Sequence, residues 1–266
     1  MDPHQVLEEA RTEIGDLLLF VTGYPPSDIP EVFENLSANF STLGVCKLLI
    51  SGEGTGFRSS LTQSGNAHRF LMRNLGPDAG QLHLALTRTS ALFDTLAAGA
   101  LKLAHELATL SATHWVATRE YEEDFLYRRV LCRLIVDGQA AVTEAREICD
   151  AIETVQEGSS TRLEICRALV GLDSEAFCTA LNQLAHEYRD DVATNRPLTG
   201  EANYLFWGRS FINVEALGLM QLARHLGMVL DCGEVALCPA HAQLDVRDAE
   251  VEDMTESAHQ IRLGNR

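Results

Sequence analysis

Apolar side chains recur with the period of an α-helix along most of the chain, and few prolines interrupt them. Phe177, Leu181, Leu184 and Tyr188 stand at positions i, i+4, i+7 and i+11, which places all four on one helix face. The 266 residues include only 7 prolines, and aromatic residues make up 6% of them, which favours helix packing over a β-sandwich. The sequence therefore predicts an all-α fold: a multi-helix array of antiparallel helical hairpins, bundle-like or solenoid-like, with little or no β-sheet.

Capping residues, glycines and prolines predict where the helices begin and end. Thr161 and Glu164 have the spacing of a capping box, and Asn213 is expected to cap a helix that Gly227 ends. The turn-rich segment Asp191–Gly200 is expected to break the preceding helix. The expected helices cover residues 4–22, 28–51, 59–75, 78–110, 119–137, 139–156, 161–170, 174–190 and 214–226.

Three features of this layout leave alternatives open. Val45–Ile50 is apolar enough to be a strand, although it lies within an expected helix. Gly99 marks either a close contact or a break in the helix expected over 78–110. We expect one helical domain over residues 1–244, in which 1–57 are a candidate subregion. Residues 245–266 are expected to be an acidic tail, either a short helix or frayed.

The stretch from Gly52 to Gly56 is rich in glycine, as phosphate-binding loops are. Such loops bind phosphate because their backbone N–H groups can approach it closely. This stretch lacks the Lys-Ser/Thr ending of a P-loop and the glycine spacing of a dinucleotide fingerprint, and Glu53 stands where a phosphate would be. We therefore interpret residues 52–56 as a flexible linker between helices.

The chain is strongly acidic. It has 38 Asp and Glu residues against 21 Lys and Arg, a formal net charge of −17. Such a surface repels nucleic acid and anionic lipid, so neither is an expected partner. It would attract a protein with a basic surface, although acidity also serves solubility alone.

Seven cysteines are scattered along the chain, mostly among apolar residues of expected helices. Their odd number and irregular spacing predict reduced, buried thiols and no disulfide framework. His225, Cys232, Cys238 and His241 carry zinc-ligand side chains, but only the last two are spaced as zinc-binding pairs are. We expect core thiols beside surface histidines there, and no metal.

The N-terminus has no basic segment, because Glu8, Glu9, Glu13 and Asp16 precede the short apolar run Leu17–Val21. A signal peptide needs a basic start, and a membrane-spanning helix needs about 20 apolar residues. We expect a cytoplasmic protein.

No residue pattern predicts catalysis. The sequence has neither the Gly-x-Ser-x-Gly elbow of hydrolases nor a histidine pair at i, i+4 with a glutamate between. The carboxylates at Glu120 and 122–124 are interpreted as complements to the dipole at a helix N-terminus. His105-Glu106 and His186-Glu187 are interpreted as solvated helix residues. The chain is therefore predicted to be no enzyme and to use no cofactor.

Three stretches follow one another in a recognisable order. They are the acidic-aromatic helix start Glu122–Tyr127, the run Arg167–Phe177, and the Leu-Ala-rich helix Phe211–Gly227. With Cys238-Pro239 after them, they resemble the immunity protein 49 family over roughly residues 90–244. The resemblance implies a cognate immunity protein of a bacterial contact-delivered toxin, such as an effector of type VI secretion. Such proteins bind the toxin domain and block its active site or its access to substrate.

An immunity protein without an export signal guards the cytosol, which favours a toxin with a cytosolic target and a nuclease as its leading class. A nuclease tends to carry a basic cleft that an acidic surface would complement. Clustered charges at helix ends are exposed, so the candidate partner-binding residues are Glu122, Glu123, Asp124, Asp190 and Asp191. Two other readings stay open: a helical-repeat adaptor with an unrelated partner, and an enzyme with a dispersed site. A homodimer also stays open.

Overall fold

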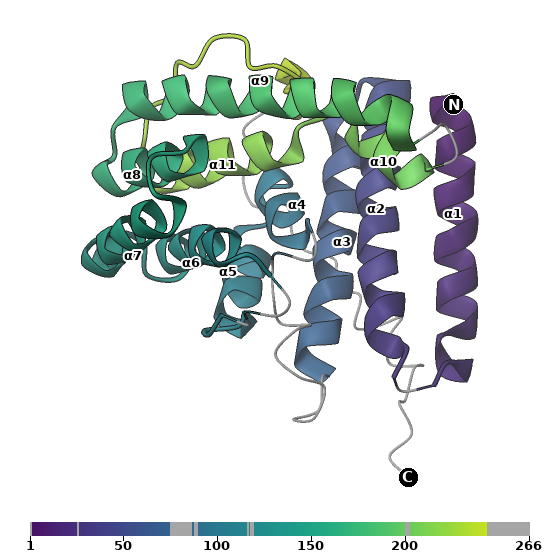
Figure 1. Ribbon diagram of the computed structural model, residues 1–266. Coiled ribbons are helices and arrows are strands. Elements are labelled where there is room, and N and C mark those ends of the chain that lie inside the picture. Colours follow the sequence, from purple (N-terminus) through teal and green to yellow (C-terminus); the bar gives the residue numbers. More distant parts are fainter. Residues whose placement is uncertain are drawn as a thin grey trace.

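A computed structural model describes residues 2–25, 27–74, 87, 90–115, 117, 120–199 and 203–243. In these ranges every regular element is a helix, which confirms the predicted all-α fold (Figure 1). None of the described helices is both long and apolar enough to cross a membrane. The α-helices are α1 (Pro3–Phe20), α2 (Ile29–Ser51), α3 (Gly54–Asn74), α4 (Ala91–Ala97), α5 (Leu101–Leu110), α6 (Glu122–Asp137), α7 (Val142–Gln156), α8 (Thr161–Gly171), α9 (Ser174–Thr199), α10 (Tyr204–Arg209) and α11 (Val214–His225).

The helices form two parts that share α2 and α3. In Figure 1, α1, α2 and α3 stand side by side, and α9 runs along the top of the view, above α8 and α11, as far as the upper ends of α3 and α2. The helices α5, α6 and α7 lie below α8 and α11 in the same view. The most extensive contact between two helices is that of α2 with α3, and α4 packs chiefly against α11.

Two clusters of buried apolar residues hold these parts together. The smaller one, the N-terminal core, joins α1 to α2 and α3 through residues such as Val6, Phe33 and Leu71. The larger one, the main core, extends from Val45 and Leu48 of α2 through α4 to α11. Because α2 and α3 contribute to both cores, neither part is packed independently of the other.

The short helix α4 sits between α3 and α11 at very close range. A Cβ added at Gly65 of α3 would collide with the Thr95 side chain, and one added at Gly218 of α11 would lie 3.0 Å from the Phe93 carbonyl oxygen. The fully buried Asp94 accepts hydrogen bonds from three hydroxyls, those of Ser41 (3.0 Å), Ser64 (2.6 Å) and Ser90 (2.9 Å). Buried polar groups persist when they are hydrogen-bonded, so this network fixes α4 against α2 and α3.

Local signals set the start and end of α11 as the sequence predicts. Asn213 Oδ1 accepts a hydrogen bond from the Ala216 N–H (2.9 Å), and Gly227 follows the helix with φ +92°. The cap of α8 is one residue earlier than expected, because Ser160 and not Thr161 accepts from the Leu163 N–H (3.3 Å).

The alternatives left open by the sequence are resolved where the structure describes them. Val45–Ile50 is part of helix α2. Gly99 adopts φ +73° and separates α4 from α5, so the helix expected over 78–110 is broken there. Residues 78–86 of that expected helix and the acidic tail 245–266 lie outside the described residues.

Two expected breaks are wrong. Residues 52–56 are no flexible linker, because Gly52 caps α2 with φ +70°, its N–H donating to the Leu48 carbonyl, and α3 already begins at Gly54. The segment 191–199 does not interrupt its helix, and α9 continues to Thr199. Val192 is buried and extends the apolar face of α9 by one more turn, so tertiary packing overrides the turn-forming residues there.

The cysteine prediction also needs correction. Cys178 of α9 and Cys232 form a disulfide, with Cα atoms 4.7 Å apart, although 54 residues separate them in sequence. The segment after α11 folds back against α9, and sequence spacing carries no signal for that approach. The thiols of the other five cysteines are free and buried, as predicted. Because Cys232 is in the disulfide, it cannot be one of the four candidate zinc ligands considered from the sequence.

Candidate functional site

A cleft of about 410 Å³ opens where α6, α8, α9 and α11 meet. The N-termini of α6, α8 and α11 all converge on it, and α9 forms a side wall. Helix N-termini carry partial positive charge and favour carboxylates in the first turn. This explains locally why Asp124 of α6 and Glu215 of α11 stand at the cleft.

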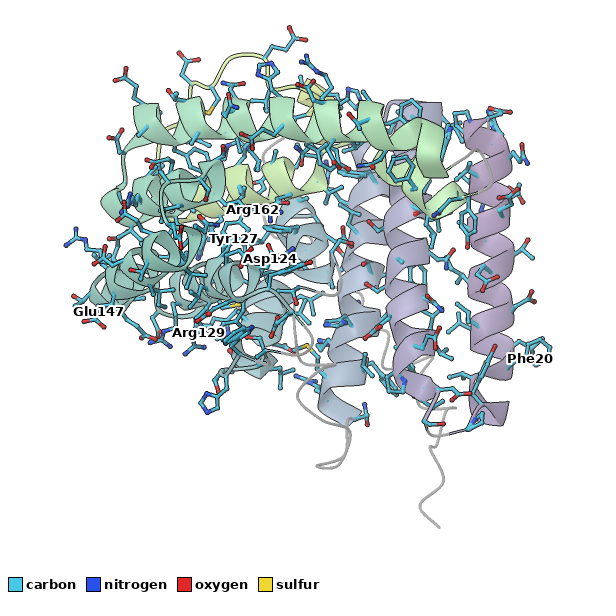
Figure 2. All side chains as sticks on the ribbon, viewed as in Figure 1. Phe20, Asp124, Tyr127, Arg129, Glu147 and Arg162 are labelled. Carbon is cyan, nitrogen blue, oxygen red and sulfur yellow. A yellow bond between two sulfur atoms is a disulfide. The ribbon has the colours of Figure 1, made fainter. Side chains whose placement is uncertain are left out.

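One side of the cleft is a fixed network around Arg162 (Figure 2). Its guanidinium donates to both carboxylate oxygens of Glu215 (3.1 Å each) and to Asp124 (2.9 Å). The Tyr127 hydroxyl also donates to Glu215 (2.9 Å), and the guanidinium carbon lies 5.0 Å from the centre of the Tyr127 ring. The network therefore connects α6, α8 and α11 through charge-assisted hydrogen bonds.

Burial and charge keep this network in one protonation state. Burial, and then the Glu215 carboxylate, raise the pKa of Tyr127 well above its usual value. Burial alone would lower the pKa of Arg162, but Glu215, Tyr127 and Asp124 together raise it. Tyr127 is therefore neutral and Arg162 charged at any physiological pH, which suits a structural role and not proton transfer.

Other carboxylates of the cleft have no cationic partner among the residues that the structure describes. Among the described residues, Glu123, Glu187 and Asp191 line the cleft and form no ion pair. Glu187 accepts hydrogen bonds from Thr161 (2.7 Å) and Gln183 (2.9 Å), and Asp191 accepts one from the Asn195 amide (2.8 Å). These neutral donors leave the negative charges uncompensated.

Two arginines of the cleft helices pair with carboxylates of α7. Arg133 of α6 pairs with Glu144 (2.7 Å), and Arg167 of α8 pairs with Glu153 (2.7 Å). Neither ion pair lies among the residues that line the first cleft.

A second, more open cleft of about 940 Å³ continues from the first along α8 and α9. Ser160, Thr161 and Glu187 line both clefts, so the two are joined. Further carboxylates line the second cleft, namely Glu164, Asp173 and Glu175. The acidic surface thus extends beyond the first cleft along the start of α9.

The structure brings together three of the five residues that the sequence singled out. Glu123, Asp124 and Asp191 line the same cleft, although Asp191 comes from a different helix. Glu122, the first residue of α6, is not among the lining residues. The Asp190 side chain is 71% exposed and pairs with the adjacent Arg189 (3.1 Å). Because α9 continues past them, residues 190 and 191 point about 100° apart and only one faces the cleft.

Sequence reasoning missed Glu187, Glu215, Arg162 and Asn213. One signal was available, since Glu187 and Asp191 are four residues apart and therefore share a helix face. The others come from the starts of α8 and α11, and only the tertiary fold brings these starts to α6.

Comparison with known proteins gives one family. Residues 51–242 match the family model described as Immunity protein 49, a span that contains α3 to α11 and every residue of the cleft. No curated protein and no solved structure matches the chain.

Proposed function

The chain belongs to the immunity protein 49 family, and on that premise we propose that it binds a cognate bacterial toxin and neutralises it in the cytoplasm. It acts by binding and not by catalysis, and it needs no cofactor. The family match carries this proposal, and the acidic cleft supports it because the cleft offers a surface of one charge sign to a partner.

The toxin is a nuclease that acts on nucleic acid in the cytosol. Nucleases bind a polyanion and so present basic surfaces around their active sites. A protein with a net charge of −17 and three unpaired carboxylates in one cleft complements such a surface. The same charge makes nucleic acid and anionic membranes poor partners for this chain.

Inhibition works by occlusion: a rigid helical face covers the toxin's active site. Glu122, Glu123, Asp124, Asp190 and Asp191 steer the approach, because charges at the edge of an interface chiefly raise the association rate. The Arg162 network holds α6, α8 and α11 in place, so little conformational entropy is lost on binding.

The test uses the toxin domain encoded next to the gene for this chain. It is produced in cells with and without this protein, and growth and nucleic-acid integrity are followed. We expect full protection, a one-to-one complex, and inhibition of nuclease activity by the purified protein. The role of charge is then measured as the association rate at several salt concentrations, with lysine at the five acidic positions.

The variant Glu147→Lys provides the matched control, because Glu147 is an exposed carboxylate of α7 outside the cleft (Figure 2). The five-position variant should associate at least tenfold more slowly with a weaker salt dependence, whereas the control changes little. Failure to protect cells would refute the immunity function. Protection against a toxin that leaves nucleic acid intact would refute the nuclease class only.

A further inference from the structure

Asn213 is the cap of α11, and one of its hydrogen-bonding atoms lacks a partner. The residue is 1% exposed and lines the first cleft. Its Oδ1 accepts the Ala216 N–H, which fixes the orientation of the amide, so that Nδ2 is the free end. Within the described residues Nδ2 has no hydrogen-bond acceptor. A buried donor without a partner costs free energy, and such groups in native proteins call for an explanation.

Gln156, the last residue of α7, lines the same cleft with a buried acceptor. Its Oε1 likewise has no hydrogen-bond donor among the described residues. Two residues that line one cleft therefore have, within the described part of the chain, an unused donor (Asn213 Nδ2) and an unused acceptor (Gln156 Oε1). A peptide group, with one C=O and one N–H, has the matching pair of groups.

The carboxylates of the cleft also favour binding of a cation. Glu123, Glu187 and Asp191 line it without ion pairs in the described part of the chain, whereas Asp124 and Glu215 are held by Arg162. A carboxylate in the first turn of a helix compensates the helix dipole, which explains those at the starts of α6 and α11. It does not explain Glu187 and Asp191, because both lie far from the start of α9 at Ser174.

We propose that the first cleft is the socket for one arginine of the toxin together with its adjoining peptide group. The guanidinium meets the carboxylates of Glu187 and Asp191, and the peptide group binds Asn213 Nδ2 and Gln156 Oε1. Arginine fits better than lysine, since its planar guanidinium donates to two carboxylates at once. A volume of about 410 Å³ lies in the range of sites for small ligands and accommodates a single residue of a partner rather than a folded element.

This inference rests on the proposed function and adds an anchoring role to the steering by acidic positions; Asp191, which lines the cleft, has both roles. Exposed charges govern how fast the proteins meet, whereas buried, hydrogen-bonded anchors govern how long they stay together. Loss of Asn213 Nδ2 should therefore raise the dissociation rate and leave the association rate nearly unchanged. Loss of the exposed Glu187 charge should raise the dissociation rate and also slow association.

The first experiment needs no toxin. The tripeptide Ac-Gly-Arg-Gly-NH2 is titrated into the full chain labelled with ¹⁵N, and amide shifts are followed by NMR. The matched probe replaces arginine with citrulline, which has the same shape and no charge. We expect saturable shifts confined to the cleft, including the Asn213 side-chain amide, and at least fivefold weaker binding of the citrulline peptide.

Three variants identify the groups responsible. Asn213→Ser keeps a capping oxygen for α11 but loses the Nδ2 donor, and Glu187→Gln loses one charge at an exposed position where folding is not at risk. Each of these two substitutions should weaken binding of the arginine peptide at least fivefold, whereas Glu147→Gln should leave its affinity unchanged. Thermal unfolding of each variant confirms that the fold is retained.

Two results would overturn the socket. The first is a set of amide shifts that do not saturate or that spread over the acidic surface. The second is an affinity for the arginine peptide that is the same in all three variants as in the unaltered chain. The cell-protection assay separates this failure from failure of the proposed function. If the unaltered chain protects and the Asn213 and Glu187 variants dissociate from the toxin no faster, the socket is wrong and the immunity function stands. If the unaltered chain fails to protect, the function itself is wrong, whatever the peptide does.

Discussion

Glu215 connects side chains from three helices. It accepts hydrogen bonds from the Tyr127 hydroxyl of α6 and from Nε and Nη2 of Arg162 of α8, and it stands in the first turn of α11. The Arg162 side chain is 39% exposed, so solvent screens much of that ion pair. The Tyr127 side chain is buried, and its hydroxyl has no equally good acceptor if Glu215 is removed.

Replacing Glu215 with glutamine should therefore lower the free energy of unfolding by about 1–2 kcal/mol, because Arg162 and Tyr127 lose a charged acceptor and keep a neutral one. Urea denaturation followed by circular dichroism measures the change. Tyr127→Phe should cost about 1 kcal/mol, and the double variant should cost less than the sum, since both changes weaken the same hydrogen bond. Glu147→Gln serves as the control and should stay within about 0.5 kcal/mol. Additive effects would mean that the two side chains do not interact.

Two buried thiols should make the folded protein less stable at high pH. Burial raises the pKa of Cys46 and of Cys238 from 9.0 to about 12. Below pH 9 both thiols are neutral in the folded and the unfolded chain, and their contribution to stability is fully present. Between pH 9 and 12 the unfolded chain ionises them and the folded chain does not. The free energy of unfolding should fall there by about 1.4 kcal/mol per pH unit for each thiol.

Urea denaturation between pH 8 and 11 checks this expectation. The double variant Cys46→Ala/Cys238→Ala loses stability at every pH because it leaves cavities, but its stability should fall less steeply as pH rises. Identical slopes for the two proteins would show that other groups cause the alkaline loss.

The helix α9 contacts several other parts of the molecule. It forms one wall of both clefts, packs along α8, and is bound to the segment after α11 by the Cys178–Cys232 disulfide. Its buried face, from Phe177 to Val192, supplies the remaining attachment to the main core and its surroundings. The position of Glu187 and Asp191 thus depends on how firmly α9 is held.

Reduction of the disulfide should destabilise the protein by about 2–4 kcal/mol, because a closed loop spanning 54 residues restricts the unfolded chain. The measurement is guanidinium denaturation with and without a phosphine reductant. Cys178→Ala should show a loss of similar size and no further response to the reductant. If the reductant does not change the denaturation midpoint of the unaltered chain, the two cysteines are not joined in solution.

The helices differ in how far their sequence predicts them. Local signals are enough for α11, where the Asn213 cap and Gly227 both act within a few residues. They are not enough for α9, which runs through a turn-rich segment because Val192 is buried. They also cannot show that the starts of α6, α8 and α11 meet, since that depends on packing over long sequence distances. The sequence therefore predicts Glu123 and Asp124 as part of one charged cluster and Asp191 as part of another, but it does not predict the cleft that these residues share.

Across the entire chain, α2 links the two cores although it lies outside the family match. The match begins at residue 51, the last residue of α2. Yet α2 makes the most extensive helix–helix contact, that with α3, and contributes Val45 and Leu48 to the main core. One helical domain over residues 1–244, with 1–57 as a candidate subregion, stays a prediction.

A chain that begins at residue 51 should therefore not fold cooperatively, even though it contains the whole matched segment. Its α3 would expose Phe57, Leu61 and Leu71, all nearly inaccessible in the intact protein. Thermal unfolding by circular dichroism and size-exclusion chromatography test this, and we expect a broad or missing transition and aggregation. A chain lacking only residues 1–25 loses fewer contacts and should keep a transition at lower temperature. A sharp transition for the shorter chain would make the matched segment an independent domain.

The unpaired carboxylates of the cleft belong to neither core. Glu123, Glu187 and Asp191 are carried by helices whose opposite faces do the packing, so a change of charge at these positions leaves the buried contacts intact. Under the proposed function, these carboxylates recognise the partner without belonging to either core, whereas Asn213 both lines the cleft and caps α11. A lineage of such proteins can then change the charge that it presents to a partner by single substitutions that leave both cores in place.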